Sequence, residues 1–158
     1  MSLEQWSKYA WLDEERASDD LNAGCLGVAI GTDETSVGQQ LGVDEGSRRE
    51  VTVHEAWQMS ESDFGNDVVQ VASLGQVVVT FEPNGWHGVE SDLATALSQS
   101  GRYVAYFSNV NAVMQFLFAE AGVLRRTFDP LLYDSDGSAN APCRRKSACR
   151  SPRAITAH

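Results

Sequence analysis

Residues 67–82, "DVVQVASLGQVVVTFE", decide the fold of this chain. Two runs rich in valine flank Gly75, and β-branched residues on both sides of a glycine predict two antiparallel strands with a tight turn near Leu74-Gly75-Gln76. A hairpin alone is marginally stable in water. The surrounding chain must therefore supply more strands, or helices, to cover this pair.

Two elements are expected before the hairpin. From Leu3 to about Ala17, apolar residues recur at steps of three and four with charges between them, which is typical of an amphipathic helix. The run "CLGVAIGT", Cys25 to Thr32, is short, apolar and bounded by glycines, which predicts a buried strand.

A second helix is expected after Thr32 or Asp33, either of which can act as N-cap, and Gly42 is its stop signal. Residues 43–50 are polar and aperiodic, which indicates a loop. Residues 52–61, "TVHEAWQMSE", fit either one or two helical turns or a strand, and the pattern leaves both open.

After the hairpin, "SDLATALSQSG" (91–101) predicts a helix capped by Ser91 and stopped by Gly101. The runs 102–109, 114–122 and 123–130 predict three strands in a meander. Helices beside such strands give an α+β fold, a two-layer domain with a mostly antiparallel sheet and two or three helices packed beside it. We expect one domain over residues 1–133 and a basic, disordered tail over 134–158.

The charge is strongly uneven along the 158 residues. Residues 1–141 hold all 22 acidic residues and only seven basic ones, whereas 142–158 hold five basic residues and no acid. An acidic body repels phosphate backbones, so we expect no nucleic-acid binding through the folded part. The charge suits solubility or a basic protein partner.

The sequence also indicates the cellular compartment in which the protein resides. It has no apolar run of the roughly 20 residues that a membrane span needs, and no signal-peptide pattern at its start. Three cysteines, Cys25, Cys143 and Cys149, do not form a disulfide framework in a domain of this size. We therefore expect a cytoplasmic protein with no membrane contact.

Familiar catalytic and metal motifs fail on their spacing. "HEAWQ" (54–58) begins like a zinc-protease motif but has Gln58 at the second ligand position. "DSDG" (134–137) does not align with a calcium-binding loop. Cys25 lies in an apolar strand, where the pKa of a thiol rises and its nucleophilicity is suppressed. We expect no catalytic residue, no metal ligand and no cofactor, and whether the chain is an enzyme stays open, with the pattern favouring a non-enzyme.

The stretch "FEPNGW" (81–86) is first of all a turn, because Pro83 presets φ at the second position, Asn84 tolerates the third and Gly85 suits the fourth. Two interpretations of Trp86 stay open. It is either a lid folded onto the core or an exposed anchor for a partner.

A second polar group, Ser108, Asn109 and Asn111, follows a later strand and also fits turn chemistry. If the two strand ends share one side of the sheet, they form one surface around Trp86. The candidate binding residues are Glu82, Asn84, Trp86, His87, Asn109 and Asn111.

Several of these segments carry a family resemblance: Trp11-Leu12, the Cys25 strand, "QQLG" (39–42), "EPNGW" (82–86) and 97–130. Over about residues 6–130 the chain resembles an actinobacterial family of uncharacterised proteins, the domain of unknown function 6461. The resemblance implies a small cytosolic α+β domain and supplies no catalytic motif. The chain departs from the family pattern after Pro130, where the basic tail follows.

Two functional hypotheses result. In the first, the chain is a protein-interaction domain, for example with an immunity or antitoxin-like role, that binds a basic partner through the surface around the EPNGW turn. In the second, it binds a small molecule, or is a cryptic enzyme, with a pocket near Trp86 and His87. The basic tail could in addition touch nucleic acid or anionic lipid by itself.

Overall fold

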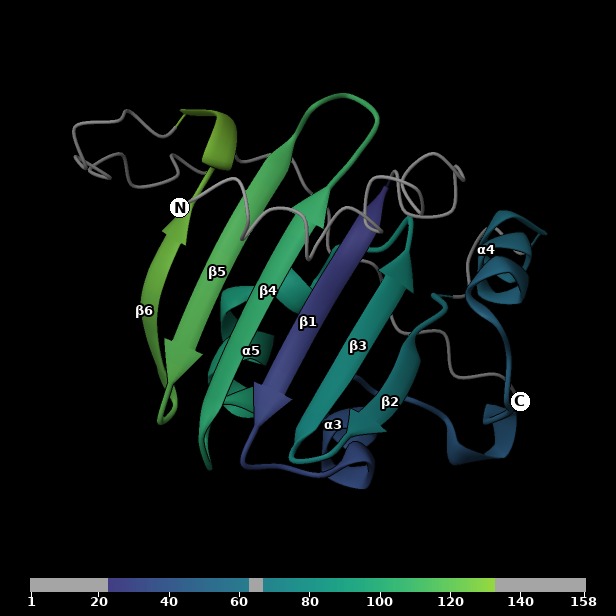
Figure 1. Cartoon of the computed structure of the whole chain (residues 1–158), viewed down its shortest axis with the longest axis horizontal. Helices are drawn as coiled ribbons and strands as arrows, with labels where there is room; N and C mark the ends of the chain where they lie inside the picture. The colour runs from purple at the N-terminus through teal and green to yellow at the C-terminus, as the bar shows by residue number, and fades with distance from the viewer. Residues whose placement is uncertain (1–22, 63–66, 133–158) are drawn as a thin grey trace, which may run out of the picture.

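The computed structural model describes residues 23–62 and 67–132, and these form a six-stranded sheet of order β2-β3-β1-β4-β5-β6 with every pair antiparallel (Figure 1). The strands are β1 (Gly24–Ile30), β2 (Gln70–Leu74), β3 (Val77–Pro83), β4 (Arg102–Ser108), β5 (Met114–Glu120) and β6 (Val123–Phe128). The helices are α3 (Glu34–Gln40), α4 (Val53–Ser62) and α5 (Ser91–Leu97), with short 3-10 turns η3 (Glu45–Ser47), η4 (His87–Val89) and η5 (Pro130–Leu132). The α+β prediction is confirmed.

The hairpin predicted around Gly75 is confirmed. Leu74 pairs with Val77, and Gly75 has a φ of 65°, a left-handed conformation that glycine adopts without steric cost. The meander over 102–130 is also confirmed, because β4, β5 and β6 pair in chain order.

Strand β1 lies between β3 and β4 and joins the two halves of the sheet. Its first residue, Gly24, pairs with Pro83 on one side and Ser108 on the other. The carboxyl ends of β3 and β4 therefore lie at the same edge of the sheet, two strands apart. This edge, which we call the upper edge, is at the top of Figure 1.

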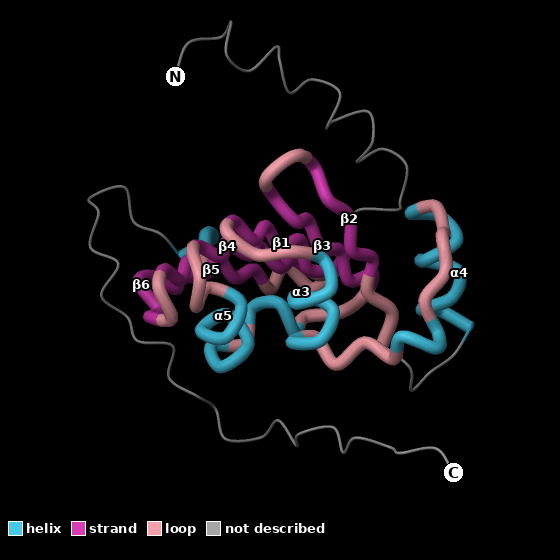
Figure 2. Tube along the Cα trace, turned by 90° about the horizontal axis from the view of Figure 1, so that it is seen from below, coloured by secondary structure: helices cyan, strands magenta, loops and turns pink. Residues whose placement is uncertain are grey.

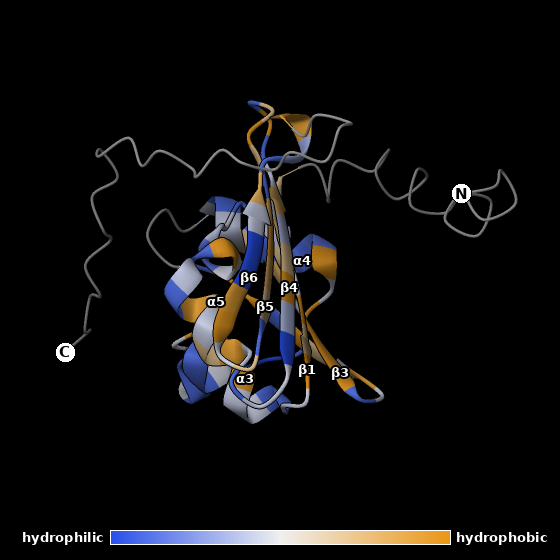
Figure 3. Cartoon of the chain, turned by 90° about the vertical axis from the view of Figure 1, so that its left-hand side faces the viewer, coloured by the Kyte–Doolittle hydropathy of each residue, from blue (hydrophilic) through white to orange (hydrophobic). Residues whose placement is uncertain are grey.

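The two faces of the sheet differ. Helices α3 and α5 lie on one face, while α4 lies beside the β2–β3 edge (Figures 2 and 3). The core forms beneath α3 and α5, where Val37, Ala94 and Leu97 from the helices pack with Tyr103 and Leu117 from the strands. We call this side the helix-covered face and the other side the open face.

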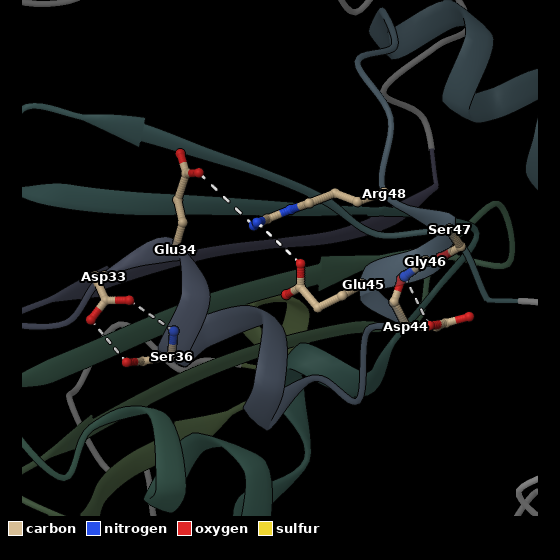
Figure 4. Close-up of polar contacts among 8 residues, drawn as sticks. All are labelled: Asp33, Glu34, Ser36, Asp44, Glu45, Gly46, Ser47 and Arg48. Atoms are coloured by element: carbon tan, nitrogen blue, oxygen red, sulfur yellow. Dashed lines mark hydrogen bonds and ion pairs between the residues drawn. The ribbon is translucent and has the colours of Figure 1, made fainter.

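Helix α3 begins where its capping signal predicted. Asp33 is the N-cap, and its carboxylate accepts hydrogen bonds from the backbone N–H and the hydroxyl of Ser36, both at 2.9 Å (Figure 4). Gly42, with a φ of 74°, follows the last turn as expected of a left-handed helix stop. Beyond it, Arg48 lies 3.5 Å from the carboxylate of Glu45 (Figure 4).

Residues 52–61, which the sequence left between helix and strand, are helical: Thr52 is the cap of helix α4, which runs from Val53 to Ser62. A reciprocal cap fixes its start: the Thr52 hydroxyl accepts from the Glu55 N–H at 3.2 Å, and the Glu55 carboxylate accepts from the Thr52 N–H at 2.7 Å. This is the capping box of a Thr-x-x-Glu sequence. The helix contacts the sheet through Trp57, whose ring centroid is 6.5 Å from that of Phe81.

Helix α5 is shorter than predicted and its cap is different. It ends at Leu97 and not near Gly101, and the cap position is Glu90, whose side chain makes no capping hydrogen bond, while Ser91 is the first helical residue. The Ser98 carbonyl accepts from Gly101 N–H at 3.0 Å and from Gly122 N–H at 3.2 Å. These bonds redirect the chain into β4 before another helical turn can form.

Two predicted segments, the first helix (Leu3 to about Ala17) and the tail (134–158), lie outside the described residues. In the part of the chain that is described, no helix is long and apolar enough to cross a membrane.

Candidate functional site

The EPNGW turn forms at the upper edge as its sequence predicts. The Gly85 N–H donates to the Glu82 carbonyl at 3.1 Å, which closes the turn, and Asn84 at the third position has a φ of 55°. A positive φ there is characteristic of a type II turn, which asparagine tolerates better than most residues. The Asn84 N–H also donates to the Ala23 carbonyl at 3.2 Å, so the turn is tied to the start of β1.

The Glu82 side chain is buried, with only 3% of the residue exposed, and it organises the segment after the turn. Its carboxylate accepts from the backbone N–H groups of His87 at 2.9 Å and Gly88 at 2.7 Å. The same carboxylate oxygen that bonds the His87 N–H lies 3.2 Å from the ring Nδ1 of His87. Hydrogen bonds to an ionised carboxylate are stronger than neutral ones. Glu82 therefore holds residues 86–88 in one conformation.

His87 lies between two carboxylates and under an aromatic ring. Its Nε2 is 3.6 Å from an Asp67 oxygen, opposite the Nδ1 that faces Glu82. The hydrogen bond with Glu82 raises the pKa of His87, burial opposes that rise, and the negative charges of Glu82, Asp67 and Glu90 add to it. The Trp86 ring stacks on the imidazole with centroids 5.9 Å apart and planes at 21°.

Trp86 remains 41% exposed while resting on His87. The exposed part of the ring is available to a partner, while the rest packs on the protein, so both interpretations of Trp86 stay open. The ring packs on His87, and Glu82 fixes His87 in turn, so this contact reduces the side-chain entropy that Trp86 loses on binding.

Beneath the turn the packing is tight. A Cβ added at Gly88 would lie 2.7 Å from Cys25 Sγ, 2.8 Å from the Tyr103 hydroxyl and 3.0 Å from a Glu82 oxygen. Cys25 and Tyr103 are at most 1% exposed. Burial, followed by the negative charge of Glu82, raises the pKa of the Cys25 thiol, so this cysteine stays protonated and is no nucleophile at neutral pH.

The second candidate cluster is mainly turn chemistry. The Asn109 side-chain oxygen accepts from the backbone N–H groups of Asn111 and Val113, each at 3.0 Å. Asn111 is exposed. In the same loop, Val110 is 81% exposed and Val113 is 50% exposed. Neither valine belongs to a sequence pattern that predicts a binding site.

The register brings the two clusters to one edge. Pro83 and Ser108 flank Gly24, so the EPNGW turn and the β4–β5 loop both leave the sheet at the upper edge. Strands two places apart are separated by roughly 10 Å, which is within the reach of a single ligand surface. We call the combined surface of Asn84, Trp86, His87, Val110, Asn111 and Val113 the edge surface.

One family model matches residues 5–142, which is most of the chain, and it is described as a family of unknown function (DUF6461). The chain belongs to the DUF6461 family. The match extends beyond the expected limit of the resemblance at Pro130 and ends at residue 142, where the basic tail begins. No curated protein and no solved structure matches the chain significantly.

The predicted site residues of this DUF6461 domain have different structural roles. Over residues 23–62 and 67–132, no group of three or more His, Cys, Asp or Glu side chains is arranged to hold a metal ion. Of the six predicted residues, Glu82 and Asn109 stabilise their loops, Asn84 shapes its turn, and Trp86, His87 and Asn111 reach the surface. Asp67, which contacts His87 at the surface, was not among the predicted residues, because it precedes β2 and is distant from His87 in the sequence.

Proposed function

We propose that this DUF6461 domain binds another protein through the edge surface, with Trp86 as the central anchor. The observation that carries the proposal is the support of a 41% exposed tryptophan by a stacked histidine and a buried carboxylate. Tryptophan is over-represented among residues that dominate binding energy, and a ring held rigid in the free state loses less entropy on binding.

Apolar neighbours on the same edge support a protein partner. Val110 and Val113 are exposed apolar residues of the β4–β5 loop at the same end of the sheet as Trp86, and Asn111 adds a polar group beside them. An apolar centre with polar groups around it is the usual composition of a protein interface.

The partner we infer carries positive charge at its contact surface. Asp67, 73% exposed at its side chain, lies against His87 at this edge, and residues 1–141 carry a net charge of −15. Such a field speeds association with a basic surface and weakens as salt is added. An immunity or antitoxin-like role in the cytoplasm is one form of this proposal, and the free thiol of Cys25 is compatible with a reducing compartment.

Site-specific photo-crosslinking tests the proposal in cells that naturally express the protein. A photoreactive phenylalanine analogue replaces Trp86 in one variant and Leu74 in the matched control. Leu74 is 64% exposed but lies at the opposite end of the sheet, in the β2–β3 hairpin. We expect a discrete protein adduct from position 86 that weakens at high salt. Equal adducts from both positions, or none from position 86, contradict the proposal.

A second candidate is a small-molecule site beside His87. The observation that favours it is the orientation of the imidazole, whose Nδ1 faces Glu82 while Nε2 points toward the partly solvated Asp67. A histidine fixed at Nδ1 by Glu82 can offer its Nε2 to a ligand that takes the place of Asp67. Chemical-shift mapping with a metabolite library tests it, because a ligand here must move the His87 ring resonances and leave those of His54, on α4, unchanged.

A further inference from the structure

The open face of the sheet carries a continuous apolar surface. Two cross-strand rows define it: Leu26, Tyr106 and Phe116 lie side by side on β1, β4 and β5, and Val28, Val104 and Phe118 form the next row. Every one of these six side chains is partly exposed, and Leu26 is 47% exposed.

The rows continue outward on both sides. On β3, Phe81 and Val79 extend the first and second rows, and on β6 Phe128 extends the first. With strands about 4.8 Å apart and same-face neighbours about 6.8 Å apart, the surface from β3 to β6 covers on the order of 300 Å². A patch of that size is comparable to the largest apolar patch on a typical monomer, and such patches are often functional.

Among the described residues, little covers this face. Helices α3 and α5 pack on the other side, and α4 reaches the open face only at its margin, through the contact of Trp57 with Phe81. The centre of the face, over β1 and β4, receives no described helix.

We propose that residues 3–17 cover this face as an amphipathic helix, with Leu3, Trp6 and Ala10 directed at the two apolar rows. This inference concerns the opposite side of the sheet from α3 and α5 and does not depend on the edge surface. The occupant is a segment of the same chain, placed by its sequence pattern, its length and its point of attachment.

Attachment places the segment over the centre of the sheet. The chain enters the sheet at Ala23 and Gly24, at the start of β1, and β1 is the third of six strands. Residues 18–22 span up to about 17 Å when extended, which is enough to turn back from the upper edge onto the open face.

Length and composition also fit. Fifteen helical residues extend about 22 Å, and the four strand spacings from β3 to β6 extend about 19 Å. The spacing of Leu3, Trp6 and Ala10 gives one apolar stripe, with Glu4 and Lys8 on the remaining surface. The family match begins at residue 5, so it covers residues 5–17 together with the sheet.

Thiol protection in the full-length chain tests the inference. Cys143 and Cys149 are replaced by serine, and Val104→Cys places a thiol at the centre of the open face. Leu74→Cys, 64% exposed in the hairpin, is the unprotected control. We expect Val104→Cys to react with a thiol reagent at least about tenfold more slowly than Leu74→Cys, because the segment must open first.

Adding Trp6→Glu to the Val104→Cys chain is expected to abolish that protection. Native Cys25, only 1% exposed in the helix-covered core, shows whether the sheet itself has unfolded, since it must stay unreactive throughout. If Cys25 reacts as well, Trp6→Glu has unfolded the sheet, and fluorescence quenching replaces thiol protection as the test. Bimane attached at Val104→Cys is quenched by a nearby tryptophan, so the conservative Trp6→Phe change must restore its emission if residues 3–17 cover this face.

The outcomes separate the possible occupants. Protection and quenching that are independent of protein concentration support residues 3–17. Protection that disappears on dilution assigns the face to a second copy and overturns the inference. Rapid reaction of Val104→Cys in the purified chain, or bimane emission unaffected by Trp6→Phe, also overturns it and leaves the face free for another protein.

Discussion

Replacing Glu82 by glutamine tests the structural basis of the site. The change keeps the size of the side chain but removes its charge and converts one oxygen into an NH2 donor. One carboxylate oxygen serves two donors, the His87 N–H and ring Nδ1, and the other serves the Gly88 N–H at 2.7 Å. The amide oxygen of glutamine can accept from the two His87 donors, but its NH2 group then faces the Gly88 N–H, so two donors meet and the Gly88 N–H has no acceptor.

The magnitude follows from these contacts. A buried N–H left without an acceptor costs about 1–3 kcal/mol, and the loss of charge assistance in the two remaining bonds adds about 1 kcal/mol. We therefore expect Glu82→Gln to lower the free energy of unfolding by about 2–4 kcal/mol, a large fraction of the stability of a small domain.

Urea unfolding followed by circular dichroism measures this loss through the midpoint and the slope. The matched control is Glu90→Gln, a half-buried carboxylate eight residues on that makes no capping hydrogen bond, and it should change stability by less than about 0.5 kcal/mol. A loss below about 1 kcal/mol for Glu82→Gln, or equal losses for both variants, refutes the role assigned to Glu82.

Three further outcomes are expected. The pKa of His87 is raised in the folded state, so the ionised imidazole contributes fully to the stability of the fold below its unfolded pKa of about 6.5, and this contribution is lost as pH rises through the folded pKa. Urea midpoints measured across that pH window should show the wild type losing its stability advantage over His87→Asn. A difference in midpoint that does not change with pH contradicts this expectation. Gly88→Ala should cost about 1–3 kcal/mol through overpacking, whereas Gly38→Ala in α3, with its nearest neighbour at 3.9 Å, should stabilise the fold or leave it unchanged in thermal melts. With the other two cysteines replaced by serine, Cys25 should react with a thiol reagent only on unfolding, and rapid labelling of the native protein would refute its burial.

Local signals allowed most elements to be predicted from sequence. Gly75 between two valine-rich runs predicted the hairpin, and Asp33 and Gly42 marked the limits of α3. The sequence could also have decided between helix and strand for residues 52–61. Thr52 and Glu55 have the spacing of a capping box, and they cap each other in the structure. Where capping chemistry is local, the residues themselves carry the information.

Long-range pairing was not predictable in the same way. Nothing in the run around Cys25 indicates that β1 lies between β3 and β4, because the central strands are apolar on both faces and any of them would suit β1 as a neighbour. The prediction of where α5 ends failed for a related reason. The carbonyl of Ser98 accepts a hydrogen bond from the N–H of Gly122, a residue that lies after β5. That contact forms only once the meander is in place.

Glu82 shows why the candidate residues were easier to find than their roles. A glutamate beside a histidine and a tryptophan suggests chemistry, but this carboxylate accepts two backbone N–H groups in addition to the contact with the imidazole, and it is 3% exposed. Any proton taken from a substrate would have to displace one of those bonds, and each displacement would release the segment that holds Trp86. The acid is therefore better suited to fixing the shape of the upper edge than to reacting at it.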